Sequence, residues 1–176
     1  MMNNQRISKI YDYKDAVGGL LFQVIRFEPK GFSQRRPFDD GFVWGISGGW
    51  YQKNGPANNY YRIKDKSADK STPPYPDAVW FDAVEPVLYR LPELIQGIQD
   101  CETIFICEGE KDADNLAALG FIATSCPMGA GKWQSTYTEA LHGCCEAVVL
   151  ADRDEPGQMH AETVAGDLSS AGIIVK

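Results

Sequence analysis

The chain lacks any long hydrophobic run. None of its apolar stretches approaches the roughly 18 residues of a membrane-spanning helix, and the opening MMNNQRISK leads into no signal-peptide segment. Histidine is scarce, with 2 in 176 residues. The five cysteines include no CxxC pair, which fits no common zinc site, and their odd number argues against a secreted disulfide framework. We therefore expect a cytoplasmic protein with no membrane partner.

Charge is unevenly divided along the chain. The net charge of −7 by itself argues against nucleic-acid binding. Residues 1–100, however, carry 13 Lys and Arg against 12 Asp and Glu, whereas residues 101–176 carry 4 against 12. The acid-rich half is suited to cations, and the basic residues of the other half are suited to a phosphate backbone or a nucleoside triphosphate.

Two apolar, strand-like runs end in carboxylates. TIFIC is followed by Glu108, with Asp112 four residues later, and AVVLA is followed by Asp152 and Asp154. Acidic groups brought close together repel one another and raise each other's pKa, a cost that a bound divalent cation removes. Hard oxygen ligands of this kind suit Mg²⁺ or Mn²⁺, so these four acids are the predicted metal ligands.

The second half, residues 101–176, alternates strands and helices as a βαβ protein does. The expected strands are 103–107, 121–125, 147–151 and 173–175, and the expected helices are 111–119, 133–141 and 158–171. Ligands of open parallel sheets bind at the carboxyl ends of the strands, which is where Glu108 and Asp152 lie. The two acids can share a metal only if the first and third strands are neighbours. A simpler role as helix-capping charges explains Asp112 well, but explains Glu108 and Asp152 poorly.

The first half, residues 1–100, has the pattern of a smaller β-rich lobe. The expected strands are 10–13, 20–27 and 42–46, followed by 79–83 or 87–89, with a hairpin turn at 15–19 and a short helix at 92–97. Asn, Gly, Pro, Ser, Lys and Asp are abundant at 51–76, which predicts a long loop with little structure of its own. The fold class is therefore α/β in the second half and α+β overall.

The acids and their surroundings resemble the TOPRIM domain shared by bacterial and phage DNA primases, topoisomerases and some nucleases. The resemblance rests on FICEGEKDADNLAALG followed by VVLADRDEPGQMHAETVA and covers about residues 101–176. In that family a Glu-Gly pair ends the first strand and an Asp-x-Asp pair ends the third. Here these pairs are Glu108-Gly109 and Asp152-x-Asp154.

The primase branch of that family also places an Asp four residues after the Glu, as Asp112 is here, and a glycine after the second Asp, as Gly157 is here. The family continues with a further strand and more acids, so the resemblance implies a TOPRIM domain cut short at its C-terminal end. It implies a parent protein from a phage or mobile element, with a helicase or zinc module elsewhere, because residues 1–50 contain no Cys or His.

The first half resembles the segment that precedes TOPRIM in phage-type and plasmid-type primases and primase-helicases. The resemblance implies a basic lobe in which Arg26, Lys30, Arg35 and Arg36 face the template or the incoming nucleotide. Arg35 and Arg36 before Pro37 are equally typical of an exposed turn. Aromatic residues that could stack on bases lie among these charges: Phe27, Phe32 and Trp44.

The activity implied by the resemblance is metal-dependent nucleotidyl transfer, the synthesis of RNA primers for DNA replication. Asp152 and Asp154 would hold Mg²⁺ or Mn²⁺, Glu108 would bind a second metal or act as base, and Lys111 or Lys132 would steady phosphates. GAGKW around Lys132 is not a Walker A motif, because Cys126 and Trp133 replace its first glycine and its Ser/Thr.

The implied partners are single-stranded DNA, nucleoside triphosphates and a helicase module or protein. Two alternatives stay open: a TOPRIM nuclease or nickase that uses the same acids, and a non-catalytic nucleic-acid-binding module. Haloacid-dehalogenase-like phosphatases and response-regulator receivers fit less well. In the former the Asp-x-Asp pair follows the first strand, and the latter lack the Glu-Gly exit.

Overall fold

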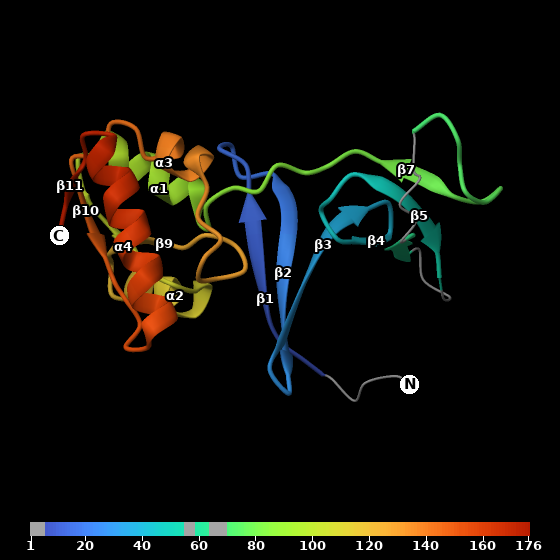
Figure 1. The fold of residues 1–176 in the computed structure, drawn as a ribbon, viewed down its shortest axis with the longest axis horizontal. Coiled ribbons are helices and arrows are strands. Elements are labelled where there is room, and N and C mark those ends of the chain that lie inside the picture. The colour runs from blue at the N-terminus through green and yellow to red at the C-terminus, as the bar shows by residue number, and fades with distance from the viewer. Residues whose placement is uncertain (1–5, 55–58, 64–69) are drawn as a thin grey trace. The chain divides into compact units, whose positions relative to one another are not determined.

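The computed structural model describes residues 6–54, 59–63 and 70–176, which form two compact units. The first unit contains Met1–Asp12 and Leu20–Pro86, and the second contains Tyr13–Gly19 and Val87–Lys176. Figure 1 shows a β-rich unit without helices in its described part and a unit in which helices flank a sheet. The α/β and α+β fold class expected from the sequence is confirmed.

The first unit is built on one sheet with the order β1-β2-β3-β4-β6-β5-β7. Its strands are β1 (Arg6–Lys14), β2 (Leu20–Glu28), β3 (Gly31–Phe38), β4 (Gly41–Trp44), β5 (Gly49–Lys53), β6 (Asn59–Arg62) and β7 (Val79–Phe81). From β2 onward, neighbouring strands pair antiparallel, except that β4 and β6 pair in parallel. The β1 to β2 hairpin turns at Asp15, whose side chain accepts hydrogen bonds from the backbone N–H groups of Val17 and Gly19. The predicted hairpin is thus confirmed.

Two sequence expectations for this unit are wrong. Arg35 and Arg36 do not lie in a turn, because Gly31–Phe38 is a strand that pairs with both β2 and β4. The segment 51–76 is not a single loop, because β6 and most of β5 lie within it. Its stretches 55–58 and 64–69 lie outside the described residues. Of the two candidates near residue 80, the strand is Val79–Phe81, and residues 87–89 form none.

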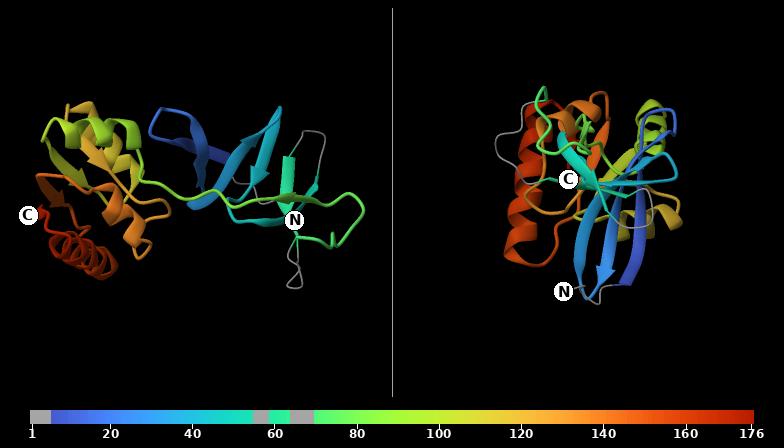
Figure 2. Two further views of the ribbon diagram at one scale, coloured as in Figure 1. Left: turned by 90° about the horizontal axis from the view of Figure 1, so that it is seen from above. Right: turned by 90° about the vertical axis from the view of Figure 1, so that its right-hand side faces the viewer.

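The second unit has a four-stranded parallel sheet with the order β11-β10-β8-β9. The strands are β8 (Thr103–Ile106), β9 (Ile122–Thr124), β10 (Glu146–Val149) and β11 (Ile174–Val175), and the helices are α1 (Leu91–Gln99), α2 (Glu110–Ala118), α3 (Ser135–Ala140) and α4 (Glu155–Ser170). Figure 2 shows α4 on one face of this sheet and α1 on the other. Every strand and helix expected beyond residue 101 is present, with ends that differ by at most three residues, and α1 joins this unit rather than the first.

The core of the second unit lies between the sheet and its helices. Leu94 of α1, Ile104 and Ile106 of β8, and Val164 and Leu168 of α4 are buried in one apolar cluster. Burying a side chain of this size contributes about 1.5–3 kcal/mol, so this cluster holds the strand ends in register. No helix among the described residues is long and apolar enough to cross a membrane.

A disulfide joins Cys101 and Cys145, which precede β8 and β10. The cysteine count did not predict it. The two residues are 44 positions apart in sequence, but their Cα atoms are 5.6 Å apart because β8 and β10 are neighbours. The other cysteines, Cys107, Cys126 and Cys144, are buried thiols.

Candidate functional site

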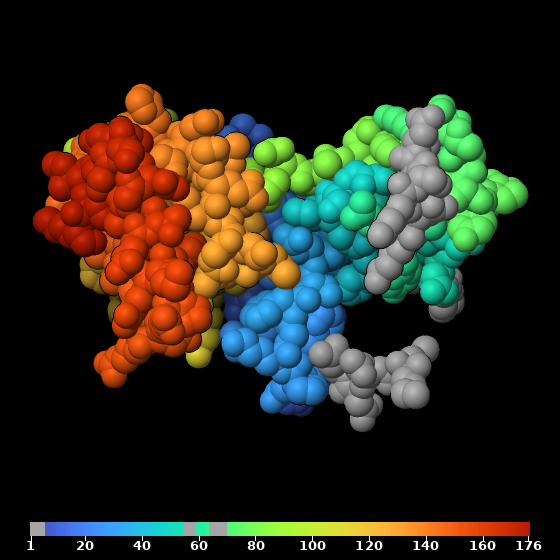
Figure 3. All heavy atoms as spheres, in the orientation of Figure 1, coloured from blue at the N-terminus to red at the C-terminus, as the bar shows by residue number. Residues whose placement is uncertain are grey.

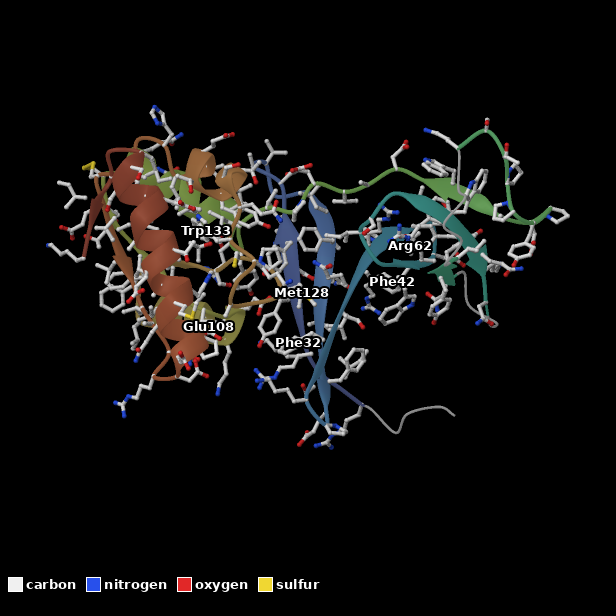
Figure 4. The ribbon with its side chains drawn as sticks, in the orientation of Figure 1. Phe32, Phe42, Arg62, Glu108, Met128 and Trp133 are labelled. Atoms are coloured by element: carbon white, nitrogen blue, oxygen red, sulfur yellow. A yellow bond between two sulfur atoms is a disulfide. The ribbon has the colours of Figure 1, made fainter. Side chains whose placement is uncertain are left out.

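The strands that end in acids are neighbours in the sheet. β8 and β10 pair in parallel, with Ile106 opposite Val149, so Glu108 and Asp152 follow the same carboxyl edge. The first and third strands of this unit are therefore neighbours, as they must be if Glu108 and Asp152 are to share a metal. Figure 4 shows Glu108 beside the N-terminal turn of α4, and Figure 3 shows α4, in orange to red, on the surface of this unit.

Gly157 marks the point at which three acids converge. A Cβ built on Gly157 would lie 2.7 Å from Oε2 of Glu108, 2.7 Å from Cβ of Asp152 and 3.0 Å from Oδ1 of Asp154. The distance between Oε2 of Glu108 and Oδ1 of Asp154 is therefore at most the sum of their distances to this built Cβ. Only a residue without a side chain allows this approach, which gives the glycine of the DEPG sequence a physical role.

Asp154 already has one structural function. It is the N-cap of α4, and its Oδ1 accepts a hydrogen bond of 2.9 Å from the backbone N–H of Gly157. Aspartate is a favoured N-cap, and its charge also interacts favourably with the helix dipole. The helix-capping role that the sequence suggested for Asp112 is therefore also a role of Asp154. Asp112 itself lies in the first turn of α2.

A pocket of about 310 Å³ opens beside these acids. Its walls include Cys107, Glu108, Asp112, Asn115, Leu116 and Asp152. Three of the four predicted ligands therefore line one cavity. Sequence reasoning missed Asn115, which follows Asp112 by one helical turn on α2 and has the same orientation; its spacing of three residues is the signal that could have found it.

Burial of Cys107 next to the acids shapes the electrostatics of this pocket. Burial, and after it the negative charges of Asp112 and Asp152, raise the pKa of the Cys107 thiol to about 12. The pKa of Cys126 is also raised to about 12, by burial and then by Glu110 and Glu108. Both thiols are therefore neutral at physiological pH, and carboxylates provide the negative charge at this edge of the sheet.

The acids have the donor chemistry for a divalent cation, but their side chains are not arranged as a ready ligand set. Within the described part of the chain, no group of three or more His, Cys, Asp or Glu side chains has such an arrangement. Oε2 of Glu108 is buried at the convergence point, whereas Asp154 is engaged with Gly157. Binding a cation would require Asp154 to turn, or Glu108, Asp152 and Asp112 to hold the ion without it. The lack of a side chain at Gly157 leaves Oε2 of Glu108 and Oδ1 of Asp154 close enough together to fit a shared cation.

A glycine-rich loop follows β9 at the same edge of the sheet. Its backbone adopts positive φ at Met128, Gly129 and Gly131. His160 of α4 is buried, and its Nδ1 accepts a hydrogen bond of 3.2 Å from the N–H of Gly131. Burial lowers the pKa of His160, which favours the neutral imidazole that this acceptor role requires. Lys132, the predicted phosphate contact, is exposed directly after this loop, and Lys111 is exposed in the first turn of α2.

The predicted basic residues of the first unit have different environments. Arg26 and Lys30 line one pocket of about 320 Å³ at the turn between β2 and β3. Arg35 is partly buried, with its guanidinium 3.6 Å from the ring centroid of Phe42. Arg36 is 6% exposed, and its guanidinium donates hydrogen bonds to backbone carbonyls, so its predicted role at a phosphate backbone does not fit this structure. Burial lowers the pKa of both Arg35 and Arg36.

Two comparisons with known proteins match phage proteins. No family model matches the chain. Gene 57 protein of Mycobacterium phage D29 is 36% identical over 90 residues, which are 51% of this chain and 57% of that protein. The chain thus spans little more than half the length of this relative. Among solved structures, the primase fragment of the bacteriophage T7 primase-helicase protein is similar, with a TM-score of 0.56 and 17% sequence identity. The match covers 94% of this chain and 51% of the primase fragment. The chain therefore has the fold of that primase fragment.

Proposed function

We propose that this chain is the catalytic core of a primase-type nucleotidyltransferase that makes RNA primers on single-stranded DNA. The observation that supports this most strongly is the convergence of Glu108, Asp152 and Asp154 on Gly157, at the carboxyl edge of two paired parallel strands. The likeness to the T7 primase fragment concerns the fold, and it supports testing a primase activity before the other activities that these acids could serve.

In this proposal the acids are the metal site of a TOPRIM domain. Asp152, Glu108 and Asp112 would hold Mg²⁺ or Mn²⁺, with Asp154 as a further ligand once it releases Gly157. The metal would neutralise triphosphate charge and act as a Lewis acid. The remaining work falls to side chains of this unit. If Glu108 does not bind the metal, it would accept a proton from an attacking hydroxyl, and Lys132, directly after the loop that His160 contacts, would steady a phosphate.

The nuclease alternative uses the same acids with water as the nucleophile, so the reaction itself must be measured. The protein is incubated with a single-stranded DNA template and ribonucleoside triphosphates, or with supercoiled plasmid, each with Mg²⁺ and with Mn²⁺. We expect oligoribonucleotides with the first substrate and no nicking of the second, and we expect Glu108→Gln to abolish synthesis. Metal-dependent nicking that Glu108→Gln abolishes would establish the nuclease instead. Absence of both reactions, with DNA binding kept after Asp152→Asn, would indicate a binding module.

A helicase partner belongs to the same proposal, because the solved neighbour is a fragment of a primase-helicase protein. Arg26 and Lys30, which share one pocket of the first unit, are the residues proposed to contact the template backbone. Such contacts make affinity fall as salt rises, by a slope close to one per phosphate neutralised. Replacement of both residues by Ala should therefore weaken template binding and flatten its salt dependence.

A further inference from the structure

A second pocket of the first unit has the lining of a nucleotide site. It has a volume of about 460 Å³ and lies between β5 and β6. Apart from one isoleucine, its walls are formed by Gln52, Lys53, Asn54, Tyr61, Arg62 and Tyr75. These are two phenols, two amides and two cations. No carboxylate is among the described residues that line it, although the chain has 24 acids against 17 bases. The pairing of β5 with β6 puts Gln52 and Tyr61 on one face of the sheet and Lys53 and Arg62 on the other, so the face with Tyr61 offers an aromatic ring and an amide to a ligand.

The ring of Tyr61 stacks on a neighbouring aromatic ring of the same sheet. Tyr61 is 43% exposed, and its ring stacks on that of Trp44 with a centroid distance of 6.0 Å and an interplanar angle of 7°. The two residues are direct partners in the pairing of β4 with β6, so their side chains project from the same face of the sheet. One face of the Tyr61 ring is covered by Trp44, and its exposed part borders the pocket.

The stack continues behind Trp44. Arg35 lies with its guanidinium 5.6 Å from the centroid of the Trp44 ring, and it is the direct partner of Trp44 in the pairing of β3 with β4. Nε of Arg35 donates a hydrogen bond of 2.8 Å to Gln23 of β2. Four adjacent strands thus contribute one side chain each to this row, and Gln52 of β5, the direct partner of Tyr61, follows it. A row fixed in this way loses little conformational entropy when one further planar group is added to it.

We propose that this pocket binds one unpaired nucleotide of a single-stranded nucleic acid, with the base against the Tyr61 ring and the base edge near the Gln52 amide. The proposal rests on the function proposed above and adds a site for the strand within the first unit. A base in a duplex has both faces covered by its neighbours, so only an unpaired base can extend the row. Stacking on an aromatic ring tolerates all four bases, because each has a π-face. A peptide partner would require apolar anchors, which the polar lining does not favour.

The test is the binding of fluorescein-labelled (dT)15 and (rU)15 to the full chain, followed by anisotropy at low salt. Tyr61→Ala should weaken binding of one or both oligonucleotides about 5- to 100-fold. Tyr61→Phe, which keeps the ring, should stay within about twofold of the unchanged protein. Phe121→Ala is a matched control in the second unit, since Phe121 is 46% exposed and should leave binding unchanged. Equal affinities for the unchanged protein and Tyr61→Ala would overturn the proposal.

A second measurement uses the unchanged protein and so does not depend on the folding of a variant. An oligonucleotide with a single 5-iodouracil is cross-linked by light, and the modified residue is identified by mass spectrometry. We expect the cross-link at Tyr61 or Tyr75; cross-links confined to other parts of the chain would contradict the proposal. So would displacement of the oligonucleotide by UTP at equal nucleotide concentration, because the ligand would then be a free nucleotide. Mn²⁺ affinity of the unchanged protein tests the acids, whereas oligonucleotide affinity of Tyr61→Ala tests this pocket, so failure of the proposed function and failure of this proposal have different readouts.

Discussion

Substitution of Gly157 by Ala tests the geometry on which the candidate site depends. The added methyl carbon would lie 2.7 Å from Oε2 of Glu108 and from Cβ of Asp152, and 3.0 Å from Oδ1 of Asp154. Ordinary contacts of a Cβ begin at 3.4 Å, so at least two of the acids must each move by several tenths of an ångström. The acids cannot stay where they are if the methyl group is present.

The expected change in the free energy of unfolding is the balance of two effects. Alanine is favoured over glycine within a helix by about 0.8–1.0 kcal/mol. Forcing an extra carbon into a filled space costs about 1–3 kcal/mol. We therefore expect Gly157→Ala to destabilise the protein by about 0–2 kcal/mol, and to weaken Mn²⁺ binding because the carboxylates are pushed apart.

Gly166 supplies the matched control in the same helix. Nothing lies within 4 Å of a Cβ at that position, so Gly166→Ala should stabilise the protein by about 0.5–1 kcal/mol through helix propensity alone. Urea denaturation followed by circular dichroism gives both values, and Mn²⁺ electron paramagnetic resonance gives the affinities. If Gly157→Ala stabilises the protein as much as Gly166→Ala and leaves Mn²⁺ affinity unchanged, the three acids do not converge on Gly157.

Three other predictions concern buried groups of the second unit. His160→Ala removes the acceptor of the Gly131 N–H at a cost of about 1–3 kcal/mol, and faster hydrogen exchange of that amide should report it. Burial lowers the pKa of His160, so the neutral side chain stabilises the folded state above the ordinary histidine pKa. This stabilisation is lost as pH falls through the folded-state pKa. The free energy of unfolding should therefore fall less between pH 7 and 5 in His160→Ala than in the unchanged protein. Tyr13→Phe removes a 2.8 Å hydrogen bond to the buried Glu110 and should cost about 1.5–3 kcal/mol by urea denaturation; no loss would show that this bond is not formed. Cys107, with a pKa of about 12, should resist iodoacetamide at pH 8 in the native protein, and rapid labelling seen by mass spectrometry would contradict its burial.

The alternation of strands and helices beyond residue 101 was predictable because each element there has a simple local cause. The strands of that sheet are short apolar runs, and each crossover helix has an apolar side that packs on the sheet. Two helix ends follow equally local signals, since Gly120 and Gly172 lie just beyond the ends of α2 and α4 with positive φ. The position of the acids at one edge followed from these elements and from the general properties of parallel sheets.

The first unit was harder to predict because its strands are polar. The sequence SQRRP within β3 has the composition of a turn, and the structure buries Arg36 by pairing its guanidinium with the carbonyl oxygens of Ile46 and Asp82. Those partners lie 10 and 46 residues away in sequence, so no local pattern reveals them. The same limit applies to β6, whose Asn and Tyr residues read as loop, and which forms a strand because β4 and β5 flank it.

Within the candidate site, the sequence predicted which acids take part, but it did not predict the contacts that they make in the structure. Glu108 and Asp152 follow apolar strands, a signal that can be read from the sequence. The use of Asp154 as an N-cap depends on where α4 begins, and the close approach to Gly157 depends on how α4 packs against β8. The contribution of Asn115 to the pocket likewise depends on the placement of α2.

The most direct test of the account is a crystal of this protein soaked in Mn²⁺, with an anomalous difference map recorded at the manganese edge. We expect a peak between the carboxylates of Glu108 and Asp152, with metal to oxygen distances of about 2.0–2.6 Å, and loss of that peak in Glu108→Gln. A map with no peak at this edge of the sheet, from crystals that bind Mn²⁺ elsewhere, would contradict the proposal that these acids form a metal-dependent catalytic site.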